Sequence, residues 1–208
     1  MSSLPNAITI ARIGLVPLFV AAFFLPVDPG RWVVFVLFCL AGVTDAIDGI
    51  VARKWNAESS FGRMLDPIAD KMIVSAALLM LAYDHTIYDY HLAPALIILC
   101  REILVSGLRE FLAGAQVGVP VTRIAKLKTV MQVAAIAALI ASSASDTMLP
   151  GVTSAALIGL WAAAALTFYT GYAYWRAGLL HVREAKGARS GAANARAPTQ
   201  PREEHRTA

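Results

Sequence analysis

Long apolar runs alternate with short polar segments along most of the chain, without the two-residue alternation that is typical of β-strands. Helices satisfy their own backbone hydrogen bonds in lipid, and crossing the core of a bilayer takes roughly 20 mainly apolar residues. The pattern therefore predicts an all-α integral membrane protein with six transmembrane helices, at about residues 8–25, 32–52, 67–83, 92–113, 129–145 and 153–175.

The composition agrees with this interpretation. Hydrophobic residues make up 58% of the 208 residues and charged residues only 15%, whereas about a quarter of an ordinary soluble domain is charged. The first apolar run is not a typical signal peptide, because Arg12 lies inside it and the following "FFLPVDPGRW" offers no clear small-residue cleavage site. We expect this run to remain as the first helix of the mature protein.

The end of the chain differs from the rest. From residue 183 the sequence reads "REAKGARSGAANARAPTQPREEHRTA", which lacks aromatic residues and cannot bury enough surface to fold. The sequence predicts a membrane domain over residues 1–182 and a disordered tail over residues 183–208. The basic residues of this tail are expected to face solvent or anionic lipid headgroups, and no nucleic-acid partner is predicted.

Basic residues gather on one side of the predicted bundle. With six helices both termini share a side, and most of the 18 Lys and Arg residues fall there, whereas the opposite loops hold Arg31 beside several aspartates. Short loops rich in Lys and Arg stay in the cytoplasm. Both termini, and the polar segment between the second and third runs, are therefore predicted to be cytoplasmic.

That polar segment, "TDAIDGIVARKWNAESSFGRMLDPIADK", carries four aspartates. Asp45 and Asp48 are three residues apart, and Asp66 and Asp70 are four apart, so each pair shares a helix face. A hairpin would bring all four carboxylates together, and their repulsion would require protonation or bound cations. Oxygen ligands favour Mg²⁺ or Mn²⁺. The alternative is that these residues are interfacial charges that cap helix ends, but clustered acids at a membrane boundary are costly and point to function.

Small residues accompany the aspartates. Gly49 costs a helix roughly 1 kcal/mol relative to alanine, which suggests that a ligand approaches the backbone there, and Ala52 extends the small face by one turn. Gly62 precedes the second acidic pair, and Arg53 could contact a phosphate or pair with an aspartate. These positions point to a group that lies close to the helix backbone beside the carboxylates.

The spacing D-x2-D-G-x2-A-R-x8-G-x3-D-x3-D resembles the signature of the CDP-alcohol phosphatidyltransferases. All eight fixed positions are matched, by Asp45, Asp48, Gly49, Ala52, Arg53, Gly62, Asp66 and Asp70. The resemblance implies a six-helix, usually dimeric membrane fold with a polar active-site cavity facing the cytoplasm, here in a bacterial inner membrane. It also implies an enzyme that transfers a phosphatidyl-type group from a CDP-linked lipid to an alcohol and releases CMP.

The resemblance further implies residue roles. Asp45, Asp48 and Asp66 would be ligands of two Mg²⁺ or Mn²⁺ ions, and Asp70 would contribute to the metal site while serving as the base. The CDP-lipid would bind along Gly49, Ala52, Arg53 and Gly62. Near the start of the chain, Asn6, Thr9 and Arg12 have helical spacing and could border this cavity. Simple anchoring at the membrane interface is the alternative for these three residues.

The alcohol must be selected by other polar residues. "REILVSGLRE" places Arg101 and Arg109 inside an apolar run, and "TRIAKLKT" gathers Arg123, Lys126 and Lys128 before the fifth run. Together they could bind an acceptor that carries its own phosphate. The alternatives are internal ion pairs with Glu102 and Glu110 in the first segment, and ordinary cytoplasmic flanking charge in the second.

These segments, together with "LPNAIT", "SSFGRMLDPIADK" and "AKLKTVMQ", resemble the bacterial phosphatidylglycerophosphate synthases, one branch of that family. This resemblance implies CDP-diacylglycerol as donor and sn-glycerol 3-phosphate as acceptor, with Arg109, Lys126 and Lys128 holding the acceptor's phosphate and Arg101 and Arg123 nearby.

Other functions remain open from the sequence. Within the family, cardiolipin synthases use phosphatidylglycerol, and phosphatidylinositol-phosphate synthases use a phosphorylated ring. Membrane prenyltransferases also bind diphosphates through aspartates, but they lack the D-G-x2-A-R core. A divalent-cation transporter would use the same carboxylates, although it would need acidic ligands at mid-membrane depth and usually shows internal repeats.

Overall fold

The computed structural model describes residues 3–55, 60–114, 123–144 and 151–195, and these residues are helical apart from short connections. For part of the helical residues only the backbone is described. The prediction of an all-α fold is confirmed in these ranges. The elements are α1 (Ser3–Ala22), α2 (Val27–Trp55), α3 (Ser60–Tyr83), the 3₁₀ turn η1 (Asp89–His91), α4 (Leu92–Gly114), α5 (Arg123–Ala144) and α6 (Val152–Ala195).

Three helices within the described residues are long and apolar enough to cross a membrane. Their candidate spans are Asp89–Gly114, Leu127–Ala144 and Val152–Arg176. The apolar stretches of the first three helices are shorter, at Ile10–Ala22, Gly30–Thr44 and Lys71–Tyr83. The two in α2 and α3 adjoin the aspartates of residues 45–70, which interrupt the apolar pattern while the helices themselves continue. The chain is a membrane protein by these features, and six crossings remain a prediction.

The helices pack around one apolar core. α5 packs against α6 and α2, α4 packs against α6, and α1 packs against both α2 and α3. Small residues permit close approach, as a Cβ on Gly159 of α6 would lie 3.4 Å from the Cβ of Ala135 on α5. Larger side chains fill the space between the other helices; the fully buried ones include Phe19, Leu81, Ile98, Ile136 and Leu160.

A buried ion pair fixes the end of α2 that is remote from the aspartates. The Arg31 guanidinium, near the start of α2, lies 2.8 Å from the Asp84 carboxylate after α3. It also donates to the Phe23 carbonyl oxygen at 3.3 Å, and its carbon lies 4.5 Å from the centre of the Phe23 ring. Asp84 in turn accepts from the Thr86 backbone N–H at 3.1 Å. The junctions α1–α2 and α3–η1 are thereby held together.

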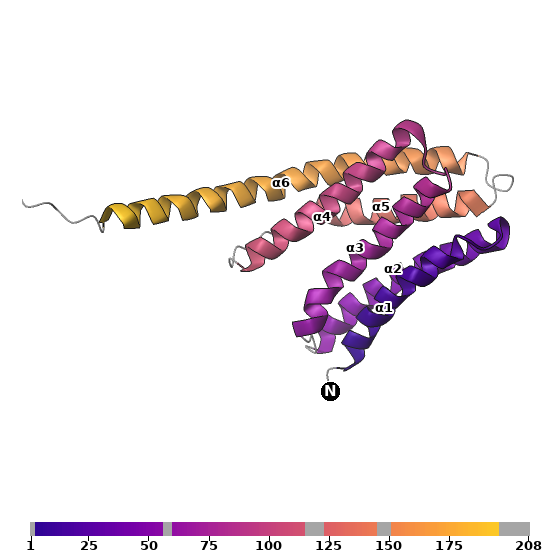
Figure 1. Cartoon of the computed structure of the whole chain (residues 1–208), viewed down its shortest axis with the longest axis horizontal. Helices are drawn as coiled ribbons and strands as arrows, with labels where there is room; N and C mark the ends of the chain where they lie inside the picture. Colours follow the sequence, from indigo (N-terminus) through magenta and orange to yellow (C-terminus); the bar gives the residue numbers. More distant parts are fainter. Residues whose placement is uncertain (1–2, 56–59, 115–122, 145–150, 196–208) are drawn as a thin grey trace, which may run out of the picture.

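The last helix is longer than the sequence predicted. α6 continues to Ala195, so residues 183–195 are helical where we expected a tail without fixed structure, and residues 196–208 lie outside the described residues. Alanine, arginine, glutamate and lysine are good helix formers, and a helix already formed extends at little cost. Figure 1 shows this part of α6 running beyond the rest of the bundle.

Candidate active site

The acid-rich segment forms the end of α2 and the start of α3. Asp45 and Asp48 lie in the second half of α2, and Asp66 and Asp70 lie in the first half of α3. Figure 1 places both of these helix ends beside the beginning of α1, at one end of the molecule. The described backbone therefore brings both aspartate pairs to the same end of the bundle.

The side chains of the predicted donor site lie outside the part of the chain that the structure describes: Asn6, Thr9, Asp45, Asp48, Gly49, Ala52, Arg53, Gly62, Asp66 and Asp70. Among the described side chains, no group of three or more His, Cys, Asp or Glu residues could hold a metal. Four carboxylates supply oxygen ligands only, which fit Mg²⁺ or Mn²⁺. Arg12, one turn after Thr9, is buried in α1 with 4% of its surface exposed.

A second polar site lies among α3, α4 and α5, centred on Glu102. The Glu102 side chain is 8% exposed, and its Oε2 lies 2.8 Å from the Lys71 Nζ of α3. Its Oε1 accepts a hydrogen bond from the Lys128 Nζ of α5, whose side chain is 5% exposed. A buried carboxylate is costly unless it is paired, so these contacts explain how Glu102 is accommodated in an apolar helix. One carboxylate thus joins three helices.

Arg101 extends this site toward α6. Its Nε donates to the Thr167 carbonyl oxygen at 3.1 Å, and its Nη2 donates to the Thr170 hydroxyl at 2.9 Å. Its Nη1 lies 3.6 Å from Glu102 Oε1. Gly171 leaves room for the side chain, because a Cβ there would come within 3.2 Å of Arg101 Cγ. We call Lys71, Arg101, Glu102 and Lys128 the Glu102 cluster; in it three cationic groups share one carboxylate.

The predicted acceptor residues are only partly brought together. Lys128 and Arg101 both belong to the Glu102 cluster, whereas Arg109 is exposed about two turns further along α4. The side chains of Arg123 and Lys126, in the first turn of α5, lie outside the described residues. Glu102 does form internal ion pairs, but its closest partners are Lys71 and Lys128 of other helices rather than the arginines of α4.

Sequence reasoning missed the partners on α3 and α6. In the sequence Lys71 is one of many basic residues on the predicted cytoplasmic side, and no residue of the sixth apolar run is predicted to belong to the site. The available signal was "TFYTG" at residues 167–171, where two threonines and a glycine recur on one helical face of an apolar segment. A helix-embedded arginine such as Arg101 requires such acceptors in a neighbouring helix.

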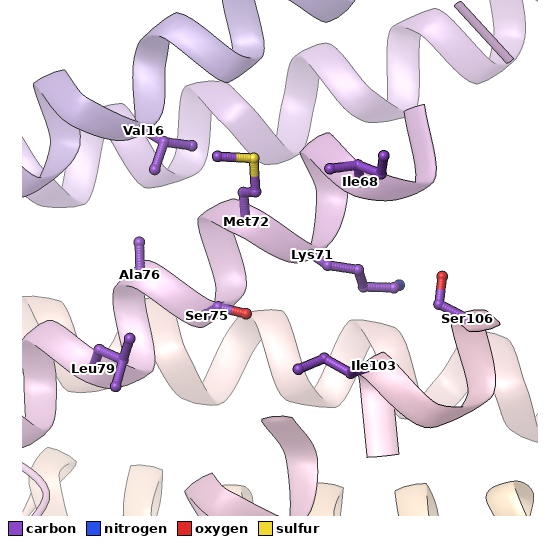
Figure 2. A pocket seen from close by; sticks show the side chains of 9 residues that line it. All are labelled: Val16, Ile68, Lys71, Met72, Ser75, Ala76, Leu79, Ile103 and Ser106. Atoms are coloured by element: carbon purple, nitrogen blue, oxygen red, sulfur yellow. The ribbon is translucent and has the colours of Figure 1, made fainter. Parts of the chain in front are cut away.

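An open groove of about 500 Å³ lies between α1, α3 and α4, beside the Glu102 cluster. Figure 2 shows Lys71 and Ser106 facing each other at one end of this groove, with Leu79 toward the other end. The remaining lining residues are mostly apolar: Val16, Ile68, Met72, Ser75, Ala76 and Ile103. The groove therefore has a cationic end and an apolar length.

Comparison with known proteins extends these observations over nearly the whole chain. The family described as CDP-alcohol phosphatidyltransferase matches residues 2–184. Several relatives carry the name CDP-diacylglycerol–glycerol-3-phosphate 3-phosphatidyltransferase. The one from Rickettsia typhi is 45% identical, covering 85% of this chain and 97% of the relative. The one from Cereibacter sphaeroides is 36% identical, covering 88% of this chain and 99% of the relative. The one from Escherichia coli K12 is 39% identical, covering 65% of this chain and 75% of the relative.

Proposed function

The chain belongs to the CDP-alcohol phosphatidyltransferase family, and we propose that it transfers the phosphatidyl group of CDP-diacylglycerol to sn-glycerol 3-phosphate. The products are phosphatidylglycerophosphate and CMP, and the reaction serves phospholipid biosynthesis. The observation that carries this proposal is the similarity, over most of the chain, to enzymes named for that reaction.

We further propose that residues 1–182 form a six-helix catalytic domain in the bacterial inner membrane, with both termini and the polar cavity on the cytoplasmic side. The distribution of Lys and Arg supports this orientation, as does the position of the acidic helix ends beside the start of α1. Residues 183–208 would form a cytoplasmic tail. By resemblance to the family, the protein would act as a homodimer in the lipid bilayer.

The donor site is proposed at the acidic ends of α2 and α3. Asp45, Asp48, Asp66 and Asp70 would hold two Mg²⁺ or Mn²⁺ ions, which when bound neutralise the diphosphate of the donor. The nucleotide would lie against the small residues of α2, the first turn of α3 and the neighbouring start of α1. The residues are Gly49, Ala52, Arg53, Gly62, Asn6 and Thr9. The all-oxygen ligand set and the shared end of the bundle support this assignment.

Transfer requires one bond to form and one to break. The primary hydroxyl oxygen of the acceptor attacks the phosphorus of the phosphatidyl group, and the bond from that phosphorus to the CMP oxygen breaks, so that the electron pair leaves with CMP. Asp70 would accept the hydroxyl proton as the general base. Arg53 would hold the phosphates of the donor in place during this displacement.

The acceptor's phosphate is proposed to bind beside the Glu102 cluster. An ammonium group has three N–H donors and a guanidinium five. Lys128 therefore retains donors beyond its bond to Glu102, and Arg101 retains donors beyond its two bonds to α6. The positive excess of the Glu102 cluster favours an anion. Arg109, Arg123 and Lys126 would complete this site.

The acceptor is tested by product analysis of the purified protein. With CDP-diacylglycerol and labelled glycerol 3-phosphate we expect labelled phosphatidylglycerophosphate and one CMP per lipid formed. Product from phosphatidylglycerol or from an inositol phosphate, with none from glycerol 3-phosphate, would instead assign one of the other family reactions. Uptake of Mn²⁺ into proteoliposomes without CMP release would indicate a divalent-cation transporter.

Removal of divalent metal is expected to abolish this activity. The four carboxylates would then lack the cations that hold them together, and the diphosphate of the donor would meet uncompensated negative charge. Turnover measured after EDTA treatment should fall to background and return on addition of Mg²⁺ or Mn²⁺, whereas EDTA already saturated with Mg²⁺ should have no effect. Full turnover by protein shown to be metal-free by elemental analysis would contradict the two-metal site.

A further inference from the structure

The groove between α1, α3 and α4 follows one face of α3. Ile68, Met72, Ser75 and Leu79 recur at helical spacing along it, and Val16 of α1 and Ile103 of α4 lie across from them. From Ile68 to Leu79 the helix rises by about 16 Å. One leaflet of a bilayer contributes about half of the roughly 30 Å hydrocarbon core. The groove therefore matches the length of an acyl chain in one leaflet.

The two ends of the groove differ in polarity. At one end the Lys71 ammonium faces Ser106 across the opening (Figure 2), and Glu102 holds that ammonium at 2.8 Å. The Lys71 side chain is 36% exposed, so it keeps N–H donors for another anion. Toward the other end the lining is apolar, with Ala76 and Leu79. A lipid has the same arrangement, with a phosphate at one end and a hydrocarbon chain extending from it.

The cationic end of the groove adjoins the proposed donor site. Ile68 lies between Asp66 and Asp70 in the sequence, and Lys71 directly follows Asp70. We propose that the groove holds one acyl chain of the CDP-linked lipid donor, with the glycerol and phosphate end of that donor at Lys71. This proposal rests on the proposed function. The cation at the groove's end, next to the aspartates, favours the donor over a bulk lipid or a second copy of the protein.

The test compares the binding of donors with long and short acyl chains after a larger side chain has narrowed the groove. Leu79 lies toward the end of the groove remote from Lys71 and is 60% exposed, so Leu79→Trp should fill that end without disturbing the core. Binding of dioleoyl and dihexanoyl CDP-diacylglycerol is measured without acceptor, at a fixed detergent fraction and with Mg²⁺ present. The dissociation constant of the dioleoyl donor should rise about ten-fold, as expected when an occupied space is overfilled. The dihexanoyl donor, too short to reach Leu79, should change by less than about two-fold.

Leu104→Trp provides the matched control. Leu104 of α4 is a leucine of similar exposure, at 63%, and does not line the groove, so binding of both donors should be unchanged. Leu79→Phe, a smaller enlargement at the same position, should reproduce the chain-length dependence if Leu79→Trp fails to fold. Equal effects on the two donors, or none on either, would overturn the proposal. If the chain-length effect is present but glycerol 3-phosphate yields no product, the groove assignment stands and the proposed acceptor is wrong.

Discussion

Replacement of Asp70 by asparagine is expected to lower turnover by about 10²–10⁴-fold, which is the contribution of a general base. Asparagine keeps the size of the side chain but cannot accept the hydroxyl proton. If three aspartates remain to hold metal, much of the affinity for CDP-diacylglycerol should persist. The measurements are CMP release under saturating substrates and equilibrium binding of the donor by the same preparation.

Asp89→Asn is the matched control for Asp70→Asn. Asp89 is exposed and lies in η1, beyond the end of α3 that is remote from Asp70, so this variant should keep normal turnover. Near-normal turnover by Asp70→Asn would exclude its role as the base. A loss of donor binding as large as the loss of turnover would assign Asp70 to the metal site alone.

Replacement of Glu102 by glutamine is expected to destabilise the protein by about 3–5 kcal/mol, since it leaves buried cations without their countercharge. Lys128 would lose its charged partner while 95% of its side chain remains out of contact with solvent. Lys71 would lose the same partner at the mouth of the groove. Unfolding in a titration of denaturing detergent measures this change in stability.

Glu110→Gln removes the same charge from an exposed position two turns further along α4 and should have little effect. The double variant Glu102→Met with Lys128→Met tests whether pairing is the cause. Replacing both members of a buried pair by apolar residues is often close to neutral, so the double variant should be more stable than the sum of its single variants predicts. Additive losses would show that Glu102 contributes through packing rather than through charge.

The acid-rich segment is recognisable in the sequence because its four aspartates lie close together along the chain. The spacing of Asp45, Asp48, Asp66 and Asp70 appears directly in the sequence, and helical geometry then places each pair on one face. The Glu102 cluster is different, because its members come from three helices that are distant in sequence. Nothing in the local pattern of Lys71 indicates a partner on α4, and that pairing depends on how the helices pack.

Hydropathy located the six helices but not all of their ends. It ended the second segment near residue 52 and began the third near residue 67, whereas α2 ends at Trp55 and α3 begins at Ser60. Polar residues stop an apolar run without stopping a helix, since helix formation depends on backbone hydrogen bonds and propensity. The same reason explains why α6 continues into the polar residues 183–195.

The position of Glu102 has a thermodynamic consequence. Its two carboxylate oxygens bind Lys71, beside the proposed donor site, and Lys128, in the proposed acceptor site. An anion that draws either lysine away from Glu102 leaves more of the carboxylate's negative charge to interact with the other lysine. The two substrates would then bind interdependently, and linkage requires each to change the affinity of the other by the same factor. Besides stabilising the helix packing, Glu102 would thereby couple the binding of the donor to the binding of the acceptor.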